Sequence, residues 1–214
     1  MINNLNILLP EIFLTISIFS ALMIGVFIKN SFNLIFNLSS IIILVTIAII
    51  FNNSNSSEKI FLDSFSRDAY SNFFKILILI SSLFVLNSSK AFIIDSKLGK
   101  FEYPIIILLS ILGMFFMVSS NDIILFYLGL ELQSLSLYIL ASIDRDNLRS
   151  SESGIKYFVL SALSSGLLLY GCSLLYGFTG STNFDLIANE LNKENIGAVF
   201  AMVFILVGLA FKVS

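Results

Sequence analysis

The 214-residue chain contains no histidine and a single cysteine, Cys172, and these two absences limit its chemistry. Without histidine, the chain lacks the commonest metal ligand and the side chain that most often shuttles protons near neutral pH. One cysteine allows no internal disulfide and no cluster held by several thiolates. Any proton transfer must therefore use carboxylates, lysines, hydroxyl groups and water, and any redox cofactor must be held by another subunit.

Charge is also scarce, because only 12% of the residues are charged, against about 25% in an ordinary soluble domain. Hydrophobic residues make up 57%, and a net charge of -2 gives no reason to expect a nucleic-acid partner. No Lys or Arg precedes Lys29, so the first apolar run is not a signal peptide and is expected to remain in the mature protein. This composition predicts an all-α, polytopic membrane protein.

Long apolar runs between polar clusters predict seven transmembrane helices. A helix needs roughly 20 mostly apolar residues to cross a hydrocarbon core, and helices satisfy their own backbone hydrogen bonds there. The third run is short but can be extended at both ends, and the loops between the runs are too short to bury a core of their own. The predicted spans are residues 7–28, 32–51, 73–86, 104–119, 123–143, 154–178 and 196–214.

The distribution of Lys and Arg over the loops predicts the orientation, since cytoplasmic or matrix loops carry more of them. One side holds Lys29, Lys90, Lys97, Lys100, Arg145 and Arg149. The other holds Lys59, Arg67 and Lys193, with Lys75 close by. The first side is therefore predicted to be the cytoplasm or matrix, with the N-terminus on the opposite, periplasmic or intermembrane, face.

Glu131 is the acid that lies deepest in a predicted span. It is eight residues into the fifth run, about 12 Å from the nearer boundary, and its side chain is too short to reach water from there. An acid at that depth usually marks an ion or proton path, although a protonated glutamate can also join two helices by a hydrogen bond. Tyr127 and Ser134 fall on the same helical face and could bind the carboxyl group or order water beside it.

For three other charged residues within the predicted spans, the sequence gives weaker evidence of a functional role. Lys156 lies near the start of its span, where its long stem favours snorkelling to the interface. Glu11 lies in the first turn of its helix, where an acid complements the helix dipole, so we interpret it as structural. Lys212 is about 24 Å along the last span, and the sequence leaves it open between an anchor and a functional charge. The hydroxyl groups of the sixth span fit close helix packing about as well as a hydrated channel.

Several motifs in order resemble the antiporter-like subunits of respiratory complex I, those of the NADH dehydrogenase subunit 2 or NuoN type. The resemblance is carried by FYLGLELQSLSLY at 126–138, SGIKYFVLSALSSGLLLYG at 153–171, LYGFTGS at 175–181 and GLAFKVS at 208–214. It covers residues 103–214 well and is weaker before them, where LPEIF at 9–13 is similar to the start of the family.

The resemblance implies the first half of an antiporter-like fold, with three leading helices in residues 1–101 and helices four to seven of the first repeat in residues 102–214. It implies proton-translocation roles for Glu131, Lys212 and Lys156. NADH, FMN, iron–sulfur clusters and quinone are then expected in partner subunits, with none bound by this chain. The mitochondrial inner membrane is favoured over the bacterial plasma membrane.

The last run ends in Lys212, Val213 and Ser214 without a polar exit, whereas the family continues into a second repeat. We therefore expect Ser214 to adjoin a second chain, or a continuation, that completes the subunit. Two other functions stay open: a subunit of a cation/proton antiporter complex of the same superfamily, and a membrane scaffold that transports nothing.

The orientation can be tested with cysteines placed at Asn147 and Ser54, which lie in loops predicted to face opposite sides. We expect a membrane-impermeant thiol reagent to label Asn147→Cys from the cytoplasmic or matrix side and Ser54→Cys from the other side. Equal or reversed labelling would contradict the predicted orientation.

Overall fold

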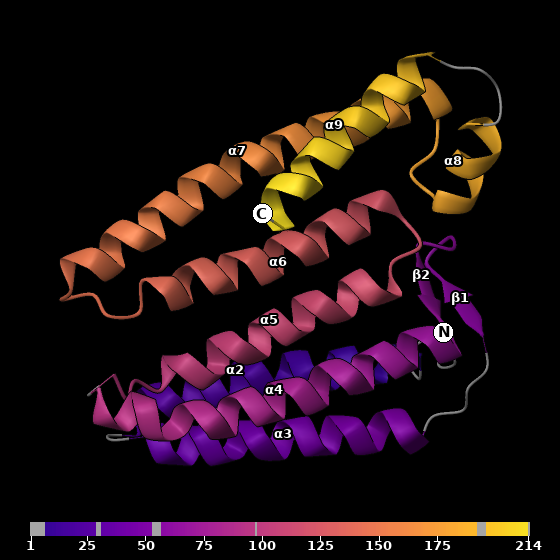
Figure 1. The fold of residues 1–214 in the computed structure, drawn as a ribbon. Helices are drawn as coiled ribbons and strands as arrows, with labels where there is room; N and C mark the ends of the chain where they lie inside the picture. Colours follow the sequence, from indigo (N-terminus) through magenta and orange to yellow (C-terminus); the bar gives the residue numbers. More distant parts are fainter. Residues whose placement is uncertain (1–6, 29–30, 53–56, 97, 192–195, 214) are drawn as a thin grey trace.

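The computed structural model describes residues 7–28, 31–52, 57–96, 98–191 and 196–213 (Figure 1). Within these residues, seven helices are long and apolar enough to cross a membrane. They are α2 (Leu9–Phe27), α3 (Phe32–Asn52), α4 (Ala69–Asp95), α5 (Glu102–Ser119), α6 (Ile123–Ala141), α7 (Leu148–Thr179) and α9 (Ile196–Val213). The prediction of a polytopic helical protein with seven spans is confirmed.

Two of the helices are longer than predicted, because polar residues that suggested loops extend them instead. Asp68 and Ser71 form a capping box, so α4 begins at Ala69, and it continues to Asp95 beyond the predicted end at residue 86. The side chain of Asn147 accepts a hydrogen bond from the backbone N–H of Arg149, so α7 begins six residues before residue 154. With 32 residues at a rise of ~1.5 Å each, α7 is longer than the core of a membrane is thick.

A short hairpin and a short helix occupy loops that were expected to be irregular. Strands β1 (Glu58–Ile60) and β2 (Phe65–Arg67) pair antiparallel, and α8 (Phe184–Leu191) precedes α9. Lys59 Nζ donates to Asp185 Oδ2 at 2.7 Å and joins β1 to α8. This hydrogen bond raises the pKa of Lys59 and lowers the pKa of Asp185. The hairpin is the one departure from an all-α fold within the described residues.

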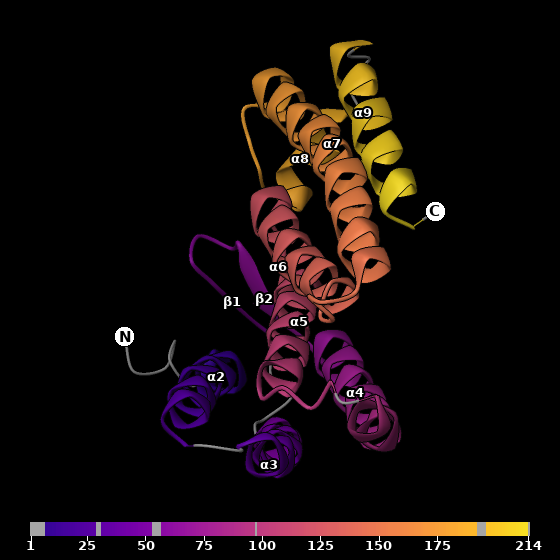
Figure 2. The same ribbon diagram turned by 90° about the vertical axis from the view of Figure 1, so that its left-hand side faces the viewer.

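The helices form two groups that meet along α5 (Figure 2). One apolar core joins α2, α3, α4 and α5 through buried residues such as Leu14, Phe36 and Phe115. A second joins α6, α7, α8 and α9 through residues such as Leu168 and Ala201. The structure therefore packs α5 both with the three leading helices and with α6, and the division at residues 101 and 102 remains a prediction about the repeat.

The loops gather at two ends of the bundle, as the orientation requires. Lys100 and Arg145 lie at the end where α6 turns into α7, and Lys59 and Arg67 lie at the hairpin end (Figure 1). Three of the charges counted for the orientation, Lys29, Lys97 and Lys193, lie outside the described residues, and so do Ser54 and Ser214. Which end faces the cytoplasm therefore remains a prediction.

Two glycines bring the backbones of α5 and α6 into direct contact. A Cβ at Gly113 would lie 2.6 Å from Gln133 N and 2.8 Å from Gly129 O, which are both backbone atoms. A Cβ at Gly129 would lie 2.8 Å from Gly113 O in return. Because backbone cannot give way as a flexible side chain can, this contact requires glycine at both positions.

We predict that Gly113→Ala separates α5 from α6 and lowers the stability of the subunit by about 1–3 kcal/mol, as overpacking does in a dense core. Gly166→Ala on α7 is the matched control, because a Cβ there meets nothing within 4 Å. The control should be neutral or slightly stabilising, since alanine favours a helix over glycine by ~1 kcal/mol. Thermal denaturation of the assembled complex measures both, and equal midpoints for the two variants would contradict the prediction.

Candidate functional site

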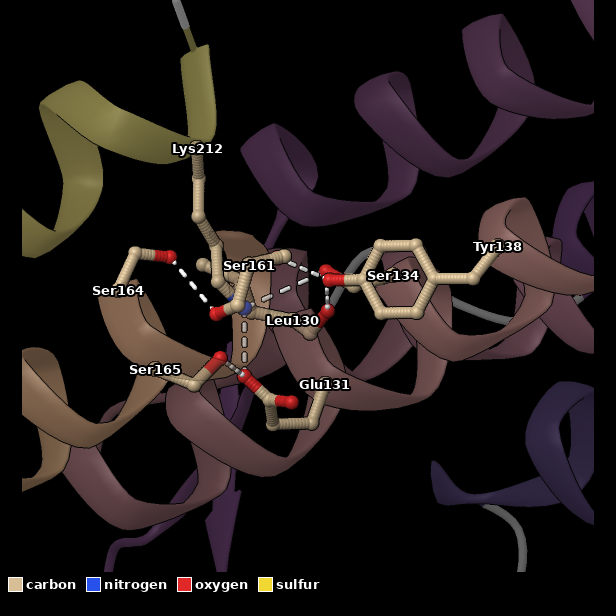
Figure 3. A network of polar contacts seen from close by, with 8 residues as sticks. All are labelled: Leu130, Glu131, Ser134, Tyr138, Ser161, Ser164, Ser165 and Lys212. Atoms are coloured by element: carbon tan, nitrogen blue, oxygen red, sulfur yellow. Dashed lines mark hydrogen bonds and ion pairs between the residues drawn. The ribbon is translucent and has the colours of Figure 1, made fainter. Parts of the chain in front are cut away.

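Glu131 and Lys212 form an ion pair between α6 and α9 (Figure 3). Lys212 Nζ lies 2.5 Å from Glu131 Oε1, although the residues are 81 positions apart in the sequence. The Lys212 side chain is 8% exposed and that of Glu131 is 22% exposed. The last turn of α9 lies beside the middle of α6, so the pair is far from both ends of the bundle (Figure 1).

The position of Glu131 follows from how α6 is held. Asp122 caps the helix, with Oδ1 accepting from Ile124 N at 2.8 Å and Oδ2 from Thr182 Oγ1 at 2.5 Å. One helical face then packs on α5 through Gly129. Glu131, two residues further on, points toward α7 and α9.

Ser165 and Ser134 each contact one member of the ion pair. Ser165 Oγ on α7 donates to Glu131 Oε1 at 2.6 Å. Ser134 Oγ donates to Leu130 O at 2.7 Å and lies 3.4 Å from Lys212 Nζ. Glu131 Oε1 therefore accepts two hydrogen bonds, whereas Oε2 accepts none from the described residues. Because only one of its two oxygens accepts hydrogen bonds in the described part of the chain, the carboxylate can bind a proton at the other oxygen without first breaking the contact with Lys212.

Hydroxyl groups continue from the ion pair toward the end where α6 turns into α7. Tyr138 is one helical turn beyond Ser134, and its hydroxyl group hydrogen-bonds Ser161 Oγ on α7 (Figure 3). Tyr138 and Ser142 line a cavity of about 530 Å³ that also contains Lys100, Glu102 and Arg145. Polar side chains thus extend from the buried ion pair to this cavity at the end of the bundle.

The structure brings together three of the five residues that the sequence singled out: Glu131, Lys212 and Ser134. Lys156 is separate, since its Nζ pairs with Glu152 Oε1 at 2.6 Å and its side chain is 70% exposed. Tyr127 packs against the apolar core of the second group, and no hydrogen bond joins its hydroxyl group to Glu131 among the described residues. The roles of all five in proton transfer remain predictions.

Sequence reasoning missed two contacts. Ser165 was one of several hydroxyl residues on the sixth span, and the spacing of Ser161, Ser165, Leu168 and Cys172 along the buried face of α7 would have selected it. Glu11, interpreted as a complement to the helix dipole, instead forms an ion pair with Lys75 of α4 at 2.5 Å, and both residues are buried. No signal in the sequence linked those two positions.

The model of the family described as NADH:quinone oxidoreductase/Mrp antiporter matches residues 120–214, which include both partners of the Glu131–Lys212 pair. Seven spanning helices with this pair at their centre place the chain in the antiporter-like class of membrane subunits. The chain is 55% identical over 213 residues to NADH-quinone oxidoreductase subunit N of Pelagibacter ubique, which covers 99% of this chain and 45% of that protein. It is 46% identical over 209 residues to subunit N of Parvibaculum lavamentivorans, covering 96% of this chain and 43% of that one.

Among solved structures, a chain of respiratory complex I from Thermus thermophilus with bound aureothin superposes with a TM-score of 0.79 at 25% identity, over 95% of this chain and 43% of that chain. The chain belongs to the family of NADH-quinone oxidoreductase subunit N and corresponds to its N-terminal half. It spans about half the length of the curated relatives that it matches. Those relatives are bacterial, so the preference for a mitochondrial membrane receives no support.

Proposed function

We propose that this chain forms part of the membrane arm of an NADH-quinone oxidoreductase and helps to carry protons across the membrane. The observation that carries the proposal is the ion pair between Glu131 and Lys212, 2.5 Å apart within spanning helices. Ionisable residues at such depth are rare and usually mark a proton or ion path. Membership of the subunit N family supports the same function.

The proposed mechanism is electrostatic. Removing one partner from a buried ion pair costs about 3–5 kcal/mol, because the remaining charge loses its neutralising neighbour without gaining water. Glu131 separated from Lys212 would therefore bind a proton, and Lys212 separated from Glu131 would release one. A movement of α9 relative to α6 would thus be coupled to proton transfer at both side chains. The uncommitted Oε2 of Glu131 is the atom at which a proton can arrive while Oε1 still accepts from Ser165.

We infer that protons reach this pair along the hydroxyl groups between α6 and α7. Ser134 and Tyr138 lie on successive turns of α6, Ser142 is the C-cap residue of that helix, and Ser161 and Ser165 face α6 from α7. Hydroxyl groups both donate and accept, so together with water they can pass a proton without holding a charge. The cavity beside Lys100 and Arg145 would then admit protons from the cytoplasmic side, since the positive-inside rule assigns those loops to the cytoplasm.

In the assembled complex, other subunits would supply the cofactors and cover the surfaces that this chain leaves exposed. The chain would act without a redox cofactor of its own, with NADH, FMN, iron–sulfur clusters and quinone held by other subunits. A segment that completes the second repeat, on the same or a separate chain, and further membrane subunits would be its neighbours. Lys156, exposed on α7, could take part in the route only where such a neighbour covers it. The bacterial origin of the relatives favours the bacterial plasma membrane as its location.

The two rival functions differ in what supports them. The family model also includes Mrp antiporters, so a cation/proton antiporter subunit shares this fold. The identity of 55% to a subunit named for NADH-quinone oxidoreductase favours the respiratory complex. A scaffold without transport does not account for a charged pair in mid-membrane, because apolar residues of similar volume would stabilise the packing at least as well.

We predict that Glu131→Gln leaves the complex assembled but lowers its coupled rate of NADH oxidation by about tenfold or more. Glutamine keeps the size and hydrogen bonding of glutamate but cannot bind the proton, and a positioned acid–base group contributes about 10²–10⁴-fold where proton transfer limits the rate. Proton uptake by sealed membrane vesicles, measured together with NADH oxidation, gives the result.

Asp63→Asn is the control for this variant, since it also removes one carboxylate. Asp63 lies in the hairpin turn at φ 64, a conformation that asparagine tolerates. We expect the control to retain the parental activity. If an assembled Glu131→Gln complex translocated protons at the parental rate, the proposed role of Glu131 would be wrong.

A further inference from the structure

The chain has a second ion pair in its interior, and the mechanism above does not use it. Glu11 on α2 and Lys75 on α4 lie at the hairpin end of the first helix group, with Lys75 Nζ 2.5 Å from Glu11 Oε1. Their side chains are 3% and 1% exposed, so this pair is more deeply buried than Glu131 and Lys212. A charge pair so fully removed from water needs further polar partners or a function.

Three buried side-chain polar atoms have no hydrogen-bond partner in the described part of the chain, one of them in the ion pair and two within a helical turn of residues that form or contact it. They are Glu11 Oε2, Asn72 Nδ2 and Ser119 Oγ, all buried. Asn72 is one helical turn before Lys75 on α4, and Ser119 is one turn after Phe115 on α5. Both turns lead toward the hairpin. These atoms offer an acceptor, a donor and a hydroxyl group, which are the partners that a buried water molecule requires.

Lys75 has an environment that stabilises a positive charge. Its Nζ lies 5.3 Å from the centre of the Phe65 ring and 5.6 Å from that of Phe115, where the faces of the rings attract a cation. These two ring contacts hold the Lys75 ammonium group beside Glu11.

Phe65 also lies beside a second cavity. It lines a pocket of about 420 Å³ beside the hairpin turn, whose lining is mostly apolar and also includes Ser64, Asp122 and Thr182. Phe65, Ile60 and Ile7 form a small apolar cluster there. The Phe65 ring thus contacts both Lys75 and this pocket.

We propose that Glu11, Lys75, Asn72 and Ser119 form a second proton-exchange site, which holds water and faces the hairpin side of the membrane. Hydronium arriving from the hairpin side would give its proton to Glu11 Oε2, which yields a carboxylic acid and water and leaves Lys75 as the ammonium ion. The reverse step would release the proton to the same face. This site deepens the proposed proton-carrying function, on which it rests, by adding a point of uptake or release remote from Glu131.

The experiment compares three variants of the assembled complex in sealed vesicles. Two quantities are measured for each variant: the number of protons translocated per NADH oxidised, and the rate of NADH oxidation in the presence of an uncoupler. Glu11→Leu with Lys75→Met replaces the pair by apolar residues of similar volume, which preserves packing where an ion pair is only structural. Glu131→Gln reports on the proposed function itself. Lys59→Gln with Asp185→Asn removes an exposed ion pair at the same face and is the matched control.

We expect the Glu11/Lys75 double variant to assemble and to oxidise NADH in the presence of uncoupler, but to translocate severalfold fewer protons than the matched control. Parental proton translocation by that double variant, with a loss in Glu131→Gln, would overturn this site and leave the proposed function intact. A loss in the double variant alone would support the site and overturn the role of Glu131. Parental translocation by both would overturn both proposals.

If the double variant fails to assemble, Asn72→Leu with Ser119→Ala decides the matter, because it removes the partners of the water and keeps the ion pair. Slower proton translocation with normal assembly would support the site. An unchanged rate would show that the Glu11–Lys75 pair serves only to join α2 to α4.

Discussion

The cost of an unpaired charge inside a bundle of spanning helices determines how this chain is assembled. An isolated carboxylate or ammonium ion in such surroundings costs several kcal/mol, so each one must find an opposite charge. Within the described residues, the charges that lie deep in the bundle meet this requirement in two ion pairs, Glu11–Lys75 and Glu131–Lys212, each at 2.5 Å. Both pairs join helices that are not consecutive in the sequence, and each belongs to one of the two helix groups. The ion pairs thus specify which helices contact each other, whereas burial of apolar side chains requires only that each helix packs against some other apolar surface.

The two ion pairs differ in their exposure and in how many of their polar atoms have hydrogen-bond partners, and this difference bears on function. Glu131 Oε1 accepts from both Lys212 and Ser165, and its side chain remains partly exposed. Glu11 is sealed on all sides, yet its second oxygen and two neighbouring polar groups have no protein partner among the described residues. A partly open pair can separate when a helix moves, whereas a sealed pair with unmatched atoms can change only by gaining or losing something as small as a proton or a water molecule.

The sequence predicted the spans because length and hydropathy alone decide whether a helix can cross a membrane. It misjudged where α4 and α7 begin, because Asp68 and Asn147 act as helix caps in stretches that resemble loops. The hairpin escaped prediction because its turn contains Phe61, Leu62 and Asp63 at positive φ, without the glycine that usually marks such a turn. Glu131 was identified from depth alone, and its partner Lys212 from the family resemblance. The spacing along α7 could have placed Ser165 on the buried face of its helix but could not have named Glu131 as its partner. The Glu11–Lys75 pair depends on how α2 and α4 rotate and pack, which no local pattern in one sequence specifies.

Helix α5 links the two ion pairs and limits the motions that can couple them. Phe115 on α5 faces Lys75, and Gly113, two residues earlier, contacts the backbone of α6 beside Gly129, itself two residues before Glu131. Because that contact is between backbones, α6 cannot slide on α5 without a clash, so α5 and α6 behave as one rigid unit. The other partner of Glu131 lies on α9, which packs closely on α7, because a Cβ at Gly171 would meet backbone atoms of α9 and one at Gly208 would meet backbone atoms of α7. Coupling between distant sites requires an element with two arrangements, and a movement of α7 and α9 together relative to α6 would change the distance between Glu131 and Lys212. A proton at Glu131 would therefore respond to movement of the α7–α9 pair of helices, while α5 keeps α6 packed against the helix group that contains Glu11 and Lys75.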